Sequence, residues 1–134
     1  MAKALLCVVV TPEQTALEQQ ADFVALPLFD GEIGIAPGHS PLIGRLGFGE
    51  MRIKSGGTTT TLYIDGGFVQ VNDNVVSVLT NSAVPAAKLS AATAESQLAA
   101  AAERPSNTPE LMEIRDRAVA QARAQLRVAR RARI

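Results

Sequence analysis

The chain has 134 residues, a formal net charge of zero, one cysteine and no tryptophan. That length fits one ordinary domain or one small domain with an appendage. The apolar run Ala4–Val10 is far shorter than the roughly 20 residues that cross a bilayer. The lone Cys7 cannot build a disulfide framework, and one His with one Cys cannot supply a structural zinc site. These observations exclude secreted, membrane-spanning and zinc-finger proteins and favour a cytoplasmic location.

The composition changes at Pro85. Residues 1–84 contain four basic and eight acidic side chains, whereas residues 85–134 contain nine basic and five acidic ones. All ten glycines lie between Gly31 and Gly67, and fifteen of the 22 alanines follow Pro85. Glycine favours turns and alanine is the best helix former. The composition therefore predicts a β-domain over residues 1–85 and a helical domain over residues 86–134.

The first domain shows short apolar or β-branched runs separated by turn residues. In chain order the predicted strands are Ala4–Val10, Phe23–Leu28, Glu32–Ile35, Leu42–Phe48, Glu50–Lys54, Thr59–Ile64, Phe68–Val71 and Val75–Thr80. The predicted separators include Ser55-Gly56-Gly57, Asp65-Gly66-Gly67 and Asn72-Asp73-Asn74. Pro27 cannot donate a ladder hydrogen bond, so it belongs at an edge, a bulge or a strand end. About eight or nine short strands at this spacing predict a β-sandwich or barrel.

Two helices, over about 90–103 and 109–133, are predicted after Pro85. Ser90 can cap the first helix, and Ala91, Ala94, Leu98 and Ala101 share one face of it. Thr108-Pro109-Glu110 provides a cap, a first-turn proline and a first-turn acid for the second. The predicted apolar face of the second helix contains Leu111, Ile114, Ala118, Ala122, Leu126, Ala129 and Ala132. The pair predicts an antiparallel hairpin whose alanine-rich seam buries little surface and opens easily.

A basic arc lies on the second helix, roughly 150° from the apolar face. It contains Arg123, Arg127, Arg130 and Arg131. Three interpretations remain open from the residues alone. The arginines complement the helix dipole together with the early acids, bind nucleic acid or an anionic membrane, or dock on an acidic protein surface.

No catalytic, cofactor-binding or metal-binding residue is predicted. Gly44-Arg45-Leu46-Gly47-Phe48-Gly49 lies between strands and is not followed by Gly-Lys-Ser/Thr, so bulge or turn glycines explain it better than a phosphate loop. His39 and Ser40 are adjacent, so their side chains point to opposite faces of an extended chain and cannot act as base and nucleophile. Glu32 and Asp65 are single carboxylates beside glycine turns. The residues therefore predict a protein that is not an enzyme.

Two motifs resemble the epsilon subunit of bacterial and chloroplast rotary F-type ATP synthases. The stretch from Gly31 to Leu42, GEIGIAPGHSPL, is similar to the family hallmark G-E-(I/L/M)-G-(I/V)-x-P-G-H-x-P-(L/F). Tyr63–Val71 and Asn74–Thr80 match at the family spacing, and Ala124–Ala129 is similar to the second helix. The resemblance covers essentially the whole chain. It implies an α+β fold with an N-terminal β-sandwich of about ten strands and a C-terminal antiparallel two-helix hairpin.

The resemblance also implies a role without chemistry of its own. Such a subunit is a peripheral protein on the cytoplasmic face of the inner membrane and belongs to the central stalk. It contacts the gamma subunit and the c-ring, so that proton flow is coupled to ATP synthesis, and it does not insert into the membrane or bind nucleic acid. By similarity, Glu32 and His39 meet the polar loops of the c-ring. The hairpin can extend to the alpha/beta catalytic head and inhibit ATP hydrolysis, with Arg123, Arg127, Arg130 and Arg131 facing an acidic segment.

One departure from the family concerns ATP. Some bacterial epsilon subunits bind ATP through (I/L)-D-x-x-R-A, where this chain has Leu89-Ser90-Ala91-Ala92-Thr93-Ala94. Ser90 replaces the aspartate and Thr93 the arginine that would pair with phosphate. We therefore expect weak or absent ATP binding. Two alternatives remain: a purely structural coupling subunit with little inhibition, or a basic-helix module that binds anions or nucleic acid.

Overall fold

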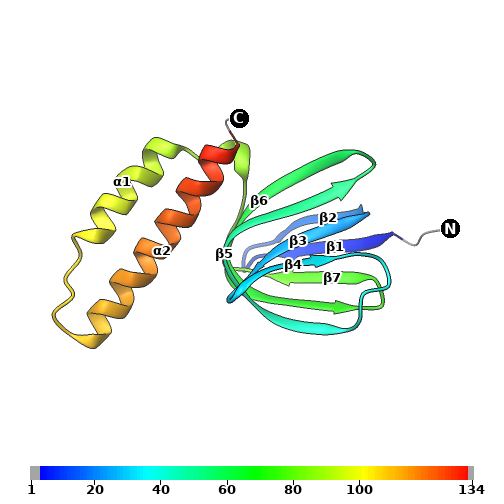
Figure 1. The fold of residues 1–134 in the computed structure, drawn as a ribbon, viewed down its shortest axis with the longest axis horizontal. Helices are drawn as coiled ribbons and strands as arrows, with labels where there is room; N and C mark the ends of the chain where they lie inside the picture. The colour runs from blue at the N-terminus through cyan, green and yellow to red at the C-terminus, as the bar shows by residue number, and fades with distance from the viewer. Residues whose placement is uncertain (1–3, 133–134) are drawn as a thin grey trace. The chain divides into compact units, whose positions relative to one another are not determined.

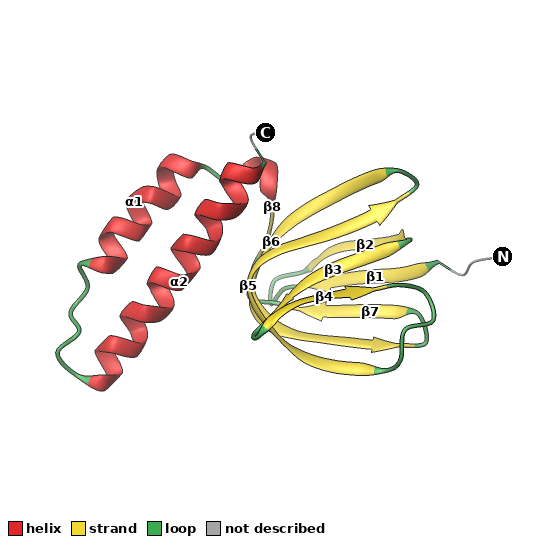
Figure 2. Cartoon of the chain, viewed as in Figure 1, coloured by secondary structure: helices red, strands yellow, loops and turns green. Residues whose placement is uncertain are grey.

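The computed structural model describes residues 4–132, which form eight strands followed by a short 3-10 turn and two α-helices (Figures 1 and 2). The strands are β1 (Leu5–Val10), β2 (Thr15–Ala21), β3 (Phe23–Leu28), β4 (Gly31–Ile35), β5 (Leu42–Ser55), β6 (Thr58–Asn72), β7 (Val75–Leu79) and β8 (Ala83–Pro85). The 3-10 turn η1 (Ala86–Lys88) precedes α1 (Ala91–Ala102) and α2 (Pro109–Arg131). The chain divides into two compact units at Pro85, and each unit is described by itself.

The strands of the first unit form one continuous sheet in the order β2-β1-β7-β6-β5-β3-β4, with β8 added to β6. All neighbours are antiparallel except β1 and β7, which run parallel. β5 and β6 are paired along almost their whole length and bend in mid-strand, so that the sheet folds over itself as a sandwich (Figure 2). One face of the folded sheet becomes the core and the other faces outward.

The bend in β5 and β6 occurs where glycines from both strands meet. Leu46 pairs with Gly67 and Phe48 with Asp65, and the buried positions change there from even to odd numbers, from Leu62 and Ile64 to Val69 and Val71 on β6. Gly66 and Gly67 have φ values of +69° and +106°, which L side chains rarely adopt. A Cβ on Gly67 would also overlap the carbonyl group of Leu79. Glycine is therefore required at the point where the strand changes faces.

The sandwich core contains the large aliphatic residues of both layers in a single cluster. Its fully buried members include Leu5, Val9, Leu26, Ile35, Met51, Ile53, Ile64, Val69, Val71 and Val76. Alternate residues of β1, β6 and β7 point inward, as the period-2 pattern of a half-buried strand requires. Cys7 lies in this core as a free thiol, and burial raises its pKa to about 12.

The described residues contain eight strands, fewer than the ten or so implied by the family resemblance. Asp65-Gly66-Gly67 was expected to separate two strands, and Gly49 lay between two others, but β6 and β5 continue through them. β2 was not expected, because Ala, Leu, Glu and Gln are better helix formers than strand formers. Its pairing with β1 decides its conformation. Pro27 lies in the irregular stretch of the β3–β5 ladder, as the sequence predicted for a bulge.

The second unit is an antiparallel pair of helices with both N-termini capped by side chains. The hydroxyl of Ser90 accepts from the amide of Thr93, and that of Thr108 accepts from Leu111. The seam contains Ala91, Ala94, Leu126 and Ala129, with Leu89 and Leu98 packed against them. The predicted apolar face of α1 is thus confirmed.

The predicted apolar face of α2 is wrong at Ile114 and Ala132, whereas Leu111 is half-buried. Ile114 is 53% exposed and Ala132 is also exposed. α1 has 12 residues and α2 has 23, so at 1.5 Å per residue α1 is about half as long. Because Ala94 packs near Leu126, α1 ends before it reaches the first turns of α2. The helix was expected to run to Arg133, which lies outside the described residues.

Candidate functional site

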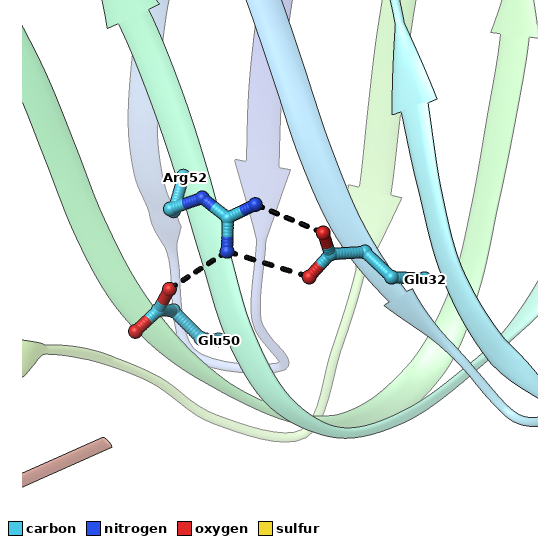
Figure 3. A network of polar contacts seen from close by, with 3 residues as sticks. All are labelled: Glu32, Glu50 and Arg52. Atoms are coloured by element: carbon cyan, nitrogen blue, oxygen red, sulfur yellow. Dashed lines mark hydrogen bonds and ion pairs between the residues drawn. The ribbon is translucent and has the colours of Figure 1, made fainter. Parts of the chain in front are cut away.

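Glu32 belongs to a network of charges on the outer face of the sandwich (Figure 3). The Arg52 guanidinium on β5 donates to both carboxylate oxygens of Glu32 on β4, at 2.9 and 3.4 Å. The same guanidinium donates at 2.8 Å to Glu50, two residues earlier on β5. Residues 50 and 52 face outward together because they alternate with the buried Met51. This charge network, Glu32–Arg52–Glu50, has a formal charge of −1.

The two carboxylates in the charge network differ in exposure. The Glu32 side chain is 52% exposed, whereas that of Glu50 is 11% exposed. Hydrogen bonding to Glu32 and then to Glu50 raises the pKa of Arg52 above its usual value. An exposed ion pair contributes little stability, on the order of 0–1 kcal/mol. Glu32 can therefore exchange partners at low cost, while Arg52 remains bonded to Glu50.

His39 lies in the loop between β4 and β5, away from Glu32. The structure places Glu32 near the start of β4, and Ile35 ends that strand about 10 Å farther on at 3.3 Å per residue. The His39 Nδ1 lies 2.7 Å from the carbonyl oxygen of Ser40. A carbonyl only accepts, so Nδ1 carries a proton and, in the neutral ring, Nε2 is an acceptor. Within residues 4–132 no hydrogen bond or ion pair joins Glu32 to His39, so they form two separate contact points.

Large apolar side chains are exposed on the outer face of the other half of the bent strands. Arg45 on β5 pairs across the sheet with Phe68, Phe68 pairs with Leu79, and Leu79 with Val10. Phe68 and Leu79 are 59% and 55% exposed, and Ile43, two residues before Arg45, is 76% exposed. Phe29 is 70% exposed and lies under the Arg45 guanidinium, 4.8 Å from ring centroid to Cζ. We call Phe29, Ile43, Phe68 and Leu79 the outer apolar face.

An exposed apolar patch with this many large side chains is typical of a protein-binding surface. The outer apolar face crosses several hydrogen-bonded strands, so the sheet holds its side chains in fixed positions. Arg45 adds a cation beside an aromatic ring, an arrangement worth about 0.5–1 kcal/mol at an exposed site. The face can therefore bind a partner without reorganising.

The four arginines predicted as a basic face are all exposed on α2. Arg130 donates to Glu95 of α1 at 3.0 Å, so it lies at the edge of the helix seam. Arg123 and Arg127 make no ion pair within residues 4–132. The hairpin thus presents at least two arginines that have no carboxylate partner in the described part of the chain.

Sequence reasoning missed Arg52, Glu50 and the outer apolar face. A signal for the last was present, since Phe68-Val69 and Val78-Leu79 are adjacent apolar residues in strands where neighbours face opposite sides. Arg52 gave no such signal, because its bond to Glu32 joins residues 20 positions apart. Within residues 4–132 no group of three or more His, Cys, Asp or Glu side chains could hold a metal ion. Neither helix in that range is apolar and long enough to span a membrane.

Comparison with known proteins finds relatives that all carry the same family description. The family model described as "ATP synthase, Delta/Epsilon chain, beta-sandwich domain" matches residues 4–86. The ATP synthase epsilon chain of Rhodopirellula baltica is 52% identical over 124 residues, which cover 92% of this chain and 97% of the relative. That of Pelotomaculum thermopropionicum is 40% identical over 96 residues, or 72% of each chain.

Solved structures give the same fold at lower identity. A chain of the Euglena gracilis mitochondrial ATP synthase, described as OSCP/F1/c-ring, superposes with a TM-score of 0.82 at 22% identity and covers 90% of this chain and 78% of that one. A chain from the central stalk and c-ring of the Tetrahymena thermophila enzyme has a TM-score of 0.75 at 13% identity, covering 95% and 97%. At these identities the two superpositions support the same fold and nothing further.

Proposed function

Because the chain belongs to the ATP synthase epsilon chain family, we propose that it is a non-catalytic rotor subunit that couples proton translocation to ATP synthesis. It binds the gamma subunit and the c-ring as a peripheral protein at the cytoplasmic face of the inner membrane. The 52% identity across nearly the whole length of an epsilon chain carries this proposal. The rigid sheet and its exposed contact residues support it.

The outer apolar face is the proposed contact with the gamma subunit. Its side chains are more than half exposed in this chain, and covering them with a partner removes apolar surface from water at about 25 cal/mol per Å². A torque-bearing contact also requires a surface that does not deform, which a hydrogen-bonded sheet provides. The assignment names residues that the sequence alone did not reveal.

Glu32 and His39 are the proposed contacts with the c-ring. A cationic group on a c-ring loop can take the Glu32 carboxylate while Arg52 keeps its 2.8 Å bond to Glu50. The nearly buried Glu50 carboxylate then keeps its partner during the exchange. Leaving that carboxylate unpaired would be costly. His39 contributes Nε2 as a hydrogen-bond acceptor at the second contact point.

The hairpin is the proposed inhibitory element. Its second helix carries Arg123 and Arg127 without ion pairs in the described residues, and Arg130 is held only by an exposed pair to Glu95. An acidic surface on the catalytic head can therefore bind this helix at little cost to the hairpin. A structural coupling subunit with little inhibition remains the second candidate, since Arg130 also has a partner within the hairpin.

Co-purification tests the coupling role. The tagged chain is isolated from a cytoplasmic-membrane extract, and we expect the gamma subunit and catalytic head to accompany it. Phe68→Asp places a negative charge on the outer apolar face and should reduce recovery of the gamma subunit at least tenfold. Thr59→Asp adds the same charge at an exposed position of β6 outside this face and should leave recovery unchanged. Full recovery with Phe68→Asp would reject this face as the gamma contact, and no recovery with the unaltered chain would reject the function.

ATP hydrolysis by the reconstituted complex tests the inhibitory role. Removing residues 108–134 should raise hydrolysis, and Arg123→Ala with Arg127→Ala should raise it in part. Arg115→Ala with Arg117→Ala is the charge control, because it removes the same charge from the N-terminal half of α2, where Arg115 is paired with Asp116. Unchanged hydrolysis after truncation would favour the structural coupling subunit.

A further inference from the structure

The β4–β5 loop, which carries His39, is tied to a distant turn by one side chain. The Oδ1 of Asn74 accepts a hydrogen bond from the Gly38 amide at 2.7 Å, across 36 residues of sequence. Asn74 belongs to the turn between β6 and β7, and its own carbonyl accepts from the Leu6 amide on β1 at 2.8 Å. A single residue thus joins the β4–β5 loop, the β6–β7 turn and the start of β1, which lie at the same end of the sandwich (Figure 1).

The turn in which Gly38 lies provides no acceptor for the Gly38 amide. The His39 amide donates to the Ala36 carbonyl at 3.1 Å, which closes a β-turn with Pro37 and Gly38 in its centre. Gly38 has φ +85°, the value of the third position of a type II turn. The amide at this position takes no part in the turn's own hydrogen bond. Asn74 supplies the acceptor that the turn lacks.

The conformation of Asn74 indicates that its side chain is used. Asn72 pairs with Val75, so Asp73 and Asn74 form a two-residue hairpin turn with φ values of +51° and +62°. Such a type I′ turn favours glycine, and a non-glycine residue in the left-handed region carries a steric cost. Glycine at position 74 would avoid that cost but could not bind Gly38.

We propose that Asn74 is a positioning residue that holds the Ala36–His39 turn, and with it His39, in the geometry that meets the c-ring. Removal of the Oδ1 acceptor frees the Gly38 amide and lets the turn rotate. Resting on the proposed contact of His39 with the c-ring, this inference adds the residue that orders that contact. It also links the two stretches that resemble the family, because Asn74 begins the second and Gly38 lies in the first.

Two substitutions separate the side chain from the backbone. Asn74→Gly keeps the left-handed backbone and removes the acceptor, whereas Asn74→Asp keeps acceptor oxygens at the same place. We expect the Gly38 amide to exchange with deuterium about fivefold faster or more in Asn74→Gly, the effect of losing one hydrogen bond of about 1 kcal/mol. Asn74→Asp should exchange as the unaltered chain does. The denaturation midpoint of Asn74→Gly should change little, because relief of the left-handed φ offsets the lost hydrogen bond.

The functional readout is ATP-driven proton pumping by the complex assembled with each variant. Lower pumping with Asn74→Gly, with normal pumping for Asn74→Asp, supports the proposal. Unchanged Gly38 exchange in Asn74→Gly overturns it, whatever the pumping. If exchange accelerates and pumping stays normal while His39→Ala lowers pumping, the His39 contact stands and the positioning role is refuted. If neither Asn74→Gly nor His39→Ala changes pumping, the contact itself is refuted together with its positioning.

Discussion

The sandwich and the hairpin bury side chains of very different size. The sandwich core is built from Leu, Ile, Val and Met, each worth about 1.5–3 kcal/mol when fully buried, whereas three of the four buried residues in the hairpin seam are alanine, with a single methyl worth about 0.8 kcal/mol. The sandwich also ties segments far apart in sequence through its ladders. We therefore expect the sandwich to act as a rigid contact module and the seam of the helical pair to open more easily.

The largest expected effect is at the bend of β6. Gly67→Ala places a Cβ against the Leu79 carbonyl at a φ that L side chains rarely adopt, so the backbone must shift. We expect the free energy of unfolding of the sandwich to fall by about 3 kcal/mol or more in a denaturant titration. Gly57→Ala, also at positive φ but in open space, should cost only about 1 kcal/mol. Equal losses would mean that the overlap does not matter.

A second prediction concerns Leu126, the largest buried side chain of the hairpin seam. Leu126→Ala removes its aliphatic contacts and should lower the opening free energy of both helices by about 2–3 kcal/mol. Amide hydrogen exchange measures this helix by helix. Met112→Ala, at an exposed position of α2, should change it by less than about 0.5 kcal/mol. Hairpin amides that exchange as slowly as the sandwich core would refute the comparison.

The third prediction uses the buried thiol in the sandwich. The pKa of Cys7 is raised from 9.0 to about 12, so the unfolded chain loses this proton at lower pH than the folded one. The protonated thiol therefore contributes to the free energy of unfolding in full below pH 9, and this contribution is lost as the pH rises toward 12. At pH 10 the free energy of unfolding should have fallen by about 1 kcal/mol more in the unaltered chain than in Cys7→Ala. If the free energy of unfolding changed equally with pH in the unaltered chain and in Cys7→Ala, the raised pKa of this thiol would be contradicted.

The smallest expected effect is at the edge of the hairpin seam. Glu95 and Arg130 form an ion pair with both side chains more than half exposed, so the pair should contribute about 0.5 kcal/mol at low salt. A double-mutant cycle with Glu95→Gln and Arg130→Gln, followed by thermal unfolding at low and high salt, measures the coupling. Coupling above about 1.5 kcal/mol that resists salt would show that the seam depends on charge and not on its alanines.

Local signals in the sequence revealed most of the elements. The change at Pro85, the capping residues Ser90 and Thr108 and the period of the apolar residues predicted the architecture and both helix starts. These features depend on neighbours in the chain, which a sequence displays directly. β2 was missed because its residues favour helix locally, and pairing with β1 overrides that preference.

The site depended on contacts between distant residues. The hallmark motif singled out Glu32 and His39 through resemblance, but only the folded sheet brings Arg52 and Glu50 to Glu32 and Asn74 to Gly38. In the same way, Phe68 looks like a core residue until the bend at Gly66 and Gly67 turns it outward, beside Leu79 on the paired strand β7. The sequence by itself determined a β-domain and a helical pair, because composition and periodicity are local, and its motifs identified the family by resemblance. Tertiary structure decided which faces are free to bind, because that depends on where bent strands carry each side chain.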